Sequence, residues 1–161
     1  MVGILGEDRG GQEASGETKG GRRLVMTFAD VVHTGARVLA TQVFPSELRS
    51  LSLIRSFVEK WAKEVGLGEE PTYRIKLSVS EACANAIEHP AQKSELTLGA
   101  WSSDDRFIVD VWHAGEFRLK SGEDQRHRGL GLPLMVASAD EVSFACLPEG
   151  GTRVSLSVFL R

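Results

Sequence analysis

The sequence lacks several features that would point to whole classes of protein. It has no excess of basic residues, since 19 lysines and arginines face 22 aspartates and glutamates and leave a net charge of −3. This balance argues against nucleic acid as a direct partner. No apolar run approaches the length of a membrane span, and the amino terminus has neither a basic region nor a long apolar one. We therefore expect a cytoplasmic protein with no membrane partner.

Cysteine is also scarce. Cys83 and Cys146 are the two cysteines of the chain, and they lie far apart without a C-x-x-C pattern. Buried free thiols are therefore expected, in place of a disulfide or a zinc site.

Length and composition bound the domain organisation. The 161 residues, 42% hydrophobic and 25% charged, are typical of one globular domain. Residues 1–23 are rich in Gly, Glu, Arg and Ser and have little to bury. This composition predicts a disordered tail at 1–23, followed by a single domain at 24–161.

Apolar spacing predicts a first helix, which begins with Ser46 as its N-cap and ends at Gly66 or Gly68. Its apolar residues recur at steps of three and four and would face the core. They are Leu51, Ile54, Val58, Trp61 and Val65.

A second helix forms the centre of the chain, with Pro71 in its first turn and Pro90 directly after its end. Glu81 and Asn85 are four residues apart and therefore lie on one face, opposite an apolar face. The polar face holds Ser78, Glu81, Asn85, Glu88 and His89, and the apolar face holds Ile75, Val79, Ala82, Cys83 and Ala86. Taken alone, such a face is most simply a solvated helix surface.

Alternating apolar residues predict two antiparallel hairpins, 95–101 with 106–112 and 141–147 with 152–160. Between them, a polar stretch at 118–128 has no periodicity and is expected to be a mobile loop before an apolar helix that ends near Ala139. Helices and hairpins in this order bury their apolar faces as one layer on another. The predicted fold is α/β, a two-layer sandwich of helices on a mixed, largely antiparallel sheet.

A glycine pair precedes the last predicted helix, in the run Arg128-Gly129-Leu130-Gly131. Glycines there let backbone N–H groups approach a phosphate, and the helix dipole adds positive potential. The alternative is a tight turn with no ligand. The loop before it carries basic residues that could neutralise phosphates, or that serve solubility alone.

The order of these motifs resembles the GHKL ATP-binding fold, and within it the bacterial anti-sigma regulatory kinases of the SpoIIAB and RsbW kind. Residues 80–89, SEACANAIEH, resemble the N box of that family, and residues 128–142, RGLGLPLMVASADEV, resemble its G2 box. The likeness covers about residues 40–161.

The resemblance implies a role for each matching residue. Asn85 would give its carbonyl oxygen to Mg²⁺ on the ATP phosphates, and Glu81 would be the general base for a substrate serine. The loop at 118–128 would be the ATP lid. Other residues would bind the nucleotide through backbone N–H groups or near adenine; they are Gly115, Arg128, Gly129, Leu130, Gly131 and Thr152. For Thr152, a purely local hydrogen bond is an equal alternative.

One position departs from the family pattern. The G1 box, D-x-G-x-G, uses its Asp to accept a hydrogen bond from the adenine amino group, and His113 stands at that position here. Gly115 is kept and the second glycine is missing. A neutral histidine can still accept one hydrogen bond through a ring nitrogen. Asp110 lies three residues earlier in the strand and should point to the opposite face.

Two functions therefore stay open. The first is an anti-sigma serine/threonine protein kinase with ATP and Mg²⁺ as cofactors, which phosphorylates an anti-anti-sigma protein of the STAS fold, sequesters a sigma factor and forms a homodimer, as the resemblance implies. The second is a pseudokinase or binding module that regulates a partner without effective ATP turnover. A sensor histidine kinase would need a helical hairpin with a phosphoacceptor histidine, which residues 1–40 are too short and glycine-rich to form.

Overall fold

The computed structural model describes residues 14–18, 22–27, 33–88, 95–115, 131–147 and 150–160. Seven strands form one sheet in the order β1-β2-β6-β7-β5-β4-β3. All neighbours are antiparallel except β2 and β6. The strands are β1 Ala14–Thr18, β2 Arg22–Thr27, β3 Arg37–Pro45, β4 Glu95–Ser102, β5 Arg106–His113, β6 Glu141–Cys146 and β7 Thr152–Phe159.

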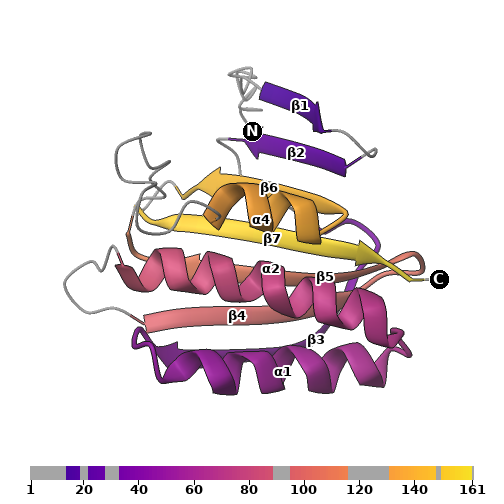
Figure 1. The fold of residues 1–161 in the computed structure, drawn as a ribbon, viewed down its shortest axis with the longest axis horizontal. Coiled ribbons are helices and arrows are strands. Elements are labelled where there is room, and N and C mark those ends of the chain that lie inside the picture. Colours follow the sequence, from indigo (N-terminus) through magenta and orange to yellow (C-terminus); the bar gives the residue numbers. More distant parts are fainter. Residues whose placement is uncertain are drawn as a thin grey trace, which may run out of the picture.

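Three helices cover one face of this sheet (Figure 1). They are α1 Ser50–Glu64, α2 Glu69–Glu88 and α4 Gly131–Ser138. Helix α1 packs on β3, α2 on β5 and β7, and α4 on β2 and β6. The core lies between the two layers. This arrangement confirms the predicted two-layer α/β sandwich with a mixed, largely antiparallel sheet.

Helix α1 ends where the sequence predicts and begins later. Gly66 adopts φ 77, and its N–H donates to the Lys63 carbonyl while the N–H of Leu67 donates to the Ala62 carbonyl. These are the two hydrogen bonds of a Schellman C-cap, which glycine favours. The predicted N-cap at Ser46 is wrong, because residues 46–49 form turns and the helix starts at Ser50.

Helix α2 begins at Glu69, two residues before Pro71, so the proline lies in the first turn, where its missing N–H costs no hydrogen bond. Its first backbone bond runs from the Thr72 N–H to the Gly68 carbonyl. The helix is described to Glu88, and the predicted end at Pro90 lies outside the described residues. All five residues of the predicted apolar face are buried, among them Ile75, Val79 and Cys83, each with none of its surface exposed.

Both predicted hairpins are confirmed. Strands β4 and β5 pair in antiparallel register through a turn at 103–105, with Gly99 opposite Asp110. Strands β6 and β7 pair with Cys146 opposite Thr152, and Gly150 and Gly151 near their connection adopt positive φ. Strand β7 also pairs with β5, so the carboxyl end of β5 lies beside the start of β7.

The amino-terminal segment differs from the disordered tail predicted for residues 1–23. Strand β1 lies inside that range, and β2 begins in it at Arg22. The two pair with each other, and β2 runs parallel to β6, with Leu24 opposite Val142. The prediction of a disordered tail rests on the composition of residues 1–23, and composition does not report the backbone hydrogen bonds by which a strand joins a free strand edge.

A buried polar cluster lies on the sheet face that the helices leave open. Asp110, with none of its surface exposed, receives hydrogen bonds from Arg153 Nη2 at 2.6 Å and Ser155 Oγ at 2.5 Å. The His33 Nε2 atom lies 2.8 Å from one Asp110 oxygen and 2.9 Å from the other. His33 belongs to the segment that passes behind the sheet into β3 (Figure 1). The cluster therefore attaches this segment to the middle of the sheet.

Aromatic side chains pack around the same cluster. The Arg153 guanidinium lies 5.1 Å from the ring centre of Trp112, and His33 meets the Trp101 ring edge-on at 5.2 Å. A Cβ atom at Gly99 would lie 2.9 Å from the Trp112 ring, so only glycine fits between the two tryptophans. Trp101 and Trp112 therefore pack within the β4–β5 hairpin.

The substitution Asp110→Ala should destabilise the protein strongly. It would break the buried ion pair of Asp110 with Arg153, and breaking such a pair by removing one partner typically costs about 3–5 kcal/mol of unfolding free energy. Urea denaturation followed by circular dichroism measures the difference. Asp104→Ala, in the exposed turn between β4 and β5, is the matched control and should change stability by at most about 0.5 kcal/mol. A loss below about 1 kcal/mol for Asp110→Ala would contradict a stabilising role for the cluster.

Candidate functional site

Several predicted site residues meet at one end of the sheet. The carboxyl-terminal half of α2, the end of β5, the start of β7 and the start of α4 lie together there (Figure 1). Helix α2 carries Glu81 and Asn85. Strand β5 ends at His113, β7 begins at Thr152 and α4 begins at Gly131. The grouping follows from the topology, because β5 ends where β7 begins and α2 crosses both.

Glu81 and Asn85 lie in the carboxyl-terminal half of α2, and both are partly buried. They are flanked in sequence by Ala82, Cys83, Ala84 and Ala86, all buried. Small side chains let a helix approach the sheet closely, and they set the direction in which the carboxylate and the carboxamide project. A carboxylate and a carboxamide oxygen one turn apart are hard donors of the kind that Mg²⁺ accepts.

His113, Gly115 and Thr152 form one cluster at the end of β5. His113 lies opposite Thr152 in the β5–β7 register, and 7% of its surface is exposed. The Thr152 hydroxyl donates a hydrogen bond to the Gly115 carbonyl at 2.9 Å. This hydrogen bond joins the backbone after β5 to the start of β7. It leaves the predicted place of Thr152 near adenine a prediction.

Gly151 makes this close approach of the two strands feasible. It adopts φ +98, and a Cβ atom there would lie 2.6 Å from the His113 carbonyl oxygen and 3.3 Å from the Ala114 Cα. Any side chain would push the two backbones apart. Residues 113–115 and Thr152 would then lose their register.

Asp110 and His113 point to opposite sides of the sheet, as the sequence predicts for residues three apart in a strand. Asp110 contacts His33 and Arg153 on the face without helices. His113 lies two residues after Val111 and four after Val109, so it is on the same face of the strand as these core residues. Asp110 therefore cannot replace a carboxylate at position 113.

Sequence reasoning missed the contacts that hold α4 against α2. The Ser78 hydroxyl, fully buried, donates to the Met135 carbonyl at 2.8 Å. Arg74 Nη1 donates to the Ser138 carbonyl at 3.2 Å and lies 3.1 Å from Asp140 Oδ1. The sequence places Ser78 on the polar face of α2 but gives no sign of its partner, which is a backbone atom 57 residues later.

The structure describes the glycine-rich run at 128–131 only at its last residue. Gly131 is the first residue of α4. Arg128, Gly129, Leu130 and the predicted lid at 118–128 lie outside the described residues. Their proposed contacts with a nucleotide stay predictions, as do the roles of Glu81 and Asn85.

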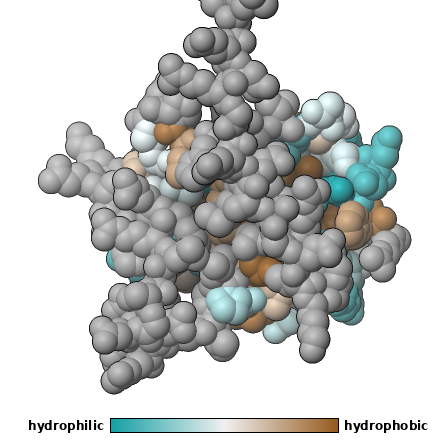
Figure 2. Space-filling model, turned by 90° about the horizontal axis from the view of Figure 1, so that it is seen from above, coloured by the Kyte–Doolittle hydropathy of each residue, from teal (hydrophilic) through white to brown (hydrophobic). Residues whose placement is uncertain are grey.

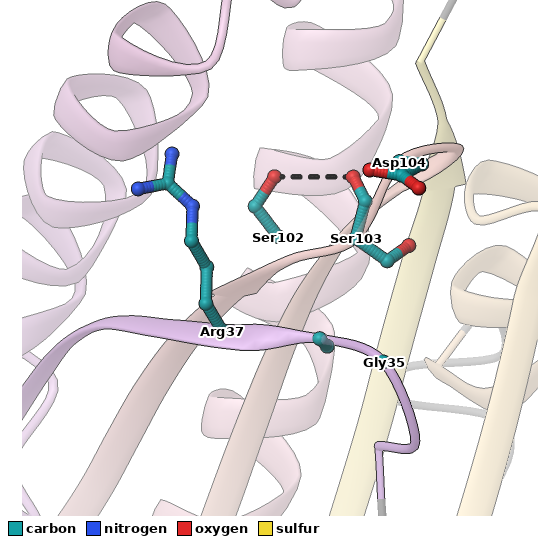
Figure 3. Close-up of a pocket in the computed structure, with 6 residues that line it drawn as sticks. Gly35, Arg37, Ser102, Ser103 and Asp104 are labelled. Carbon is teal, nitrogen blue, oxygen red and sulfur yellow. Dashed lines mark hydrogen bonds between the residues drawn. The ribbon is translucent and has the colours of Figure 1, made fainter.

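A small cavity lies at the other end of the sheet. It has a volume of about 310 Å³ and is lined by Gly35, Ala36, Arg37, Ser102, Ser103 and Asp104. Figure 3 shows Arg37 rising from β3 on one side and the β4–β5 turn on the other. His113 ends the strand that begins next to this turn, so the cavity lies roughly 20 Å from it at the usual rise of a strand. The cavity is therefore separate from the cluster at His113.

Among the residues that the structure describes, no group of three or more His, Cys, Asp or Glu side chains could hold a metal ion. None of the helices described is both long and apolar enough to cross a membrane. Seen from above, the described residues show brown hydrophobic areas next to teal hydrophilic ones (Figure 2).

Both cysteines are free, as predicted, but only one is buried. Cys83 is buried in α2, and Cys146 is exposed at the end of β6. The expectation of two buried thiols is wrong for Cys146, because the strand leaves the core at that residue. Burial raises the pKa of the Cys83 thiol to about 12.

A family model for the histidine kinase-like ATPase domain matches residues 44–158. The match covers most of the chain and all the elements that meet at the candidate site. The chain therefore belongs to the histidine kinase-like ATPase domain family, and the GHKL resemblance is confirmed.

The chain is also similar to individual proteins. The serine-protein kinase RsbW of Bacillus licheniformis is 27% identical over 135 residues, which cover 72% of this chain and 82% of that protein. A crystal structure of the RsbU and RsbW domains of a Mycobacterium tuberculosis protein matches with a TM-score of 0.58 at 19% identity. The match covers 76% of this chain and 33% of that one, and it shows a shared fold.

The raised pKa of Cys83 predicts a pH dependence of stability. In the unfolded chain the thiol ionises near pH ~8.5, while in the folded chain it stays protonated to about pH 12. Above pH ~8.5 the unfolded state binds fewer protons, so this contribution to stability is present below that pH and falls by up to about 1.4 kcal/mol per pH unit above it.

Urea denaturation at pH 8 and pH 10.5 measures this slope. Cys83→Ala removes the titrating group, and Cys146→Ala, whose thiol is exposed, is the matched control. The expected result is a smaller loss of stability between the two pH values in Cys83→Ala than in the wild type or the control. Equal losses in all three proteins would contradict the buried thiol.

Proposed function

We propose that this protein is a serine/threonine protein kinase of the anti-sigma type, which binds MgATP and transfers the γ-phosphoryl group to a serine of a partner protein. The observation that carries the proposal is the position of Glu81 and Asn85 on α2, at the end of the sheet where His113, Gly115 and Thr152 meet. The family of ATPase domains and the likeness to a serine-protein kinase support it.

The donors on α2 suit Mg²⁺ held jointly with phosphates. Asn85 would give its carbonyl oxygen to the ion, and the described residues form no all-protein metal cage there. Mg²⁺ commonly keeps few protein ligands and takes the rest from phosphate and water. When bound, it would neutralise the charge that develops on the transferred phosphoryl group.

Glu81 would act as the general base. It lies one helical turn before Asn85, so its carboxylate projects from the same face of α2. A carboxylate there would accept the proton of the attacking serine hydroxyl as that oxygen approaches the γ-phosphate. The backbone N–H groups near Gly129 and Gly131 would hold the phosphates at the start of α4.

The partners proposed follow the family. The phosphorylated protein would be an anti-anti-sigma protein of the STAS fold, and the protein would sequester a sigma factor by direct binding, as a homodimer. Phosphorylation of the STAS partner would regulate transcription indirectly, without contact between this protein and nucleic acid. The net charge of −3 agrees with a protein that does not bind nucleic acid directly.

A second candidate function rests on His113. Its ring occupies the position where the family pattern has an aspartate, and it is 7% exposed at the end of β5. A ring nitrogen accepts one hydrogen bond only while it lacks a proton, whereas a carboxylate accepts several. A chain that has lost adenine recognition would serve as a binding module with the same partner surface.

Titration calorimetry with MgATP tests the nucleotide site and separates the two functions. The kinase proposal predicts one-to-one binding by the wild type and about tenfold tighter binding by His113→Asp, which restores a charged acceptor. Ser52→Asp adds the same charge at the exposed start of α1 and should bind like the wild type. Binding by His113→Asp alone would overturn the kinase proposal and favour the binding module.

Phosphotransfer tests the role of Glu81. The STAS-domain proteins encoded in the same genome would be incubated in turn with this protein and radiolabelled ATP. Glu81→Gln keeps the size of the side chain and removes the base, so the transfer rate should fall by about 10²–10⁴ while the Kd for MgATP stays within about threefold. Unchanged transfer by Glu81→Gln would show that Glu81 is not the base.

A further inference from the structure

The contacts between α2 and α4 join the two parts of the site that would act on one nucleotide. Helix α4 has eight residues, Gly131–Ser138, and is too short to be stable without tertiary contacts. Its start would hold phosphates, and α2 carries Glu81 and Asn85. The relative position of the two helices therefore decides whether the phosphates and the metal ligand are within reach of each other.

Ser78 fixes the middle of α4. Its hydroxyl donates to the Met135 carbonyl, which also accepts the N–H of Ala139 at 3.2 Å, within the turn after the helix. Met135 lies four residues after Gly131, or about 6 Å along the helix. Ser78 lies three residues before Glu81, one turn away. This buried hydrogen bond thus joins α2 one turn before Glu81 to α4 about one turn after Gly131.

Arg74 fixes the end of α4. The Ser138 carbonyl is one of the last four of the helix, which have no partner within it, and the Arg74 guanidinium satisfies it. Positive charge there is also favourable for the helix dipole. Asp140, which pairs with Arg74, accepts the backbone N–H of Phe159 and gives its own N–H to the Ser157 carbonyl. The contact is therefore anchored in β7.

We infer that Arg74 and Ser78 are positioning residues, which hold the start of α4 at the distance from Asn85 that a metal-bound nucleotide requires. The inference rests on the proposed function and names two residues that would set the geometry of its nucleotide site. A slip of α4 by one residue along its axis would move its start by about 1.5 Å. Misplacement of that size is enough to weaken a ligand that must contact both helices.

The test is the dependence of ATP affinity on magnesium. MgATP would contact both Asn85 and the start of α4, whereas ATP in EDTA would lack the link to Asn85. The ratio of the Kd for ATP in EDTA to the Kd for MgATP therefore reports the relative placement of the helices. A loss of stability alone would lower the melting temperature without changing this ratio at temperatures where the variant is folded.

Ser78→Ala should lower the ratio by about five- to tenfold, the effect of one hydrogen bond. Ser80→Ala is the matched control on the same helix, because the Ser80 hydroxyl donates to the Lys76 carbonyl at 2.8 Å and its bond stays within α2. The control should keep the wild-type ratio.

Arg74 supplies a second pair of variants, on a side chain that is 22% exposed and more tolerant of change than Ser78. Arg74→Met should lower the ratio as Ser78→Ala does, and Arg74→Lys, which keeps the charge, should recover part of it. Wild-type binding together with unchanged ratios in Ser78→Ala and Arg74→Met would overturn the positioning role alone. A wild type that binds no MgATP would overturn the proposed function and the positioning role with it.

Discussion

The close packing of α2 against β5 and β7 is the contact on which the candidate site depends. Ala82, Cys83 and Ala86 are buried between the helix and the sheet, and each is small enough to let the two layers approach. Larger side chains at these positions would lift the helix and move Glu81 and Asn85 with it, since protein interiors are close-packed. The positions of Glu81 and Asn85 are therefore a consequence of core packing.

Polar groups complete this packing on both sides of the sheet. On the helical side, the Ser78 hydroxyl and the Arg74 guanidinium connect α2 to backbone carbonyls of α4. On the opposite side, Asp110 gathers Arg153, Ser155 and His33. Each group would destabilise the fold if it were buried alone, so these bonds restrict how the elements can be arranged. The bonds from Ser78 and Arg74 also fix the position of α4 against α2, which carries Glu81 and Asn85.

Local patterns predicted most of the elements. Helical spacing and Gly66 located α1, and alternation located the β4–β5 and β6–β7 hairpins, because these signals act over a few residues. The errors have a different origin. Serine is a residue type favoured at N-caps, but bends and turns at 46–49 place the helix start at Ser50 and not after Ser46. Strand β1 pairs with β2 and β2 with β6 through backbone hydrogen bonds, which the composition of residues 1–23 does not indicate.

The sequence by itself determined the order of the elements from α1 onward, the polar face of α2 with Glu81 and Asn85, and the unusual histidine at position 113. These follow from residue identity and spacing within one element. Only the tertiary structure decided that Thr152 bonds to Gly115, that Ser78 holds Met135 and that His33 reaches Asp110. Such contacts join residues 37, 57 and 77 positions apart, and they depend on how the layers pack, which no local pattern records.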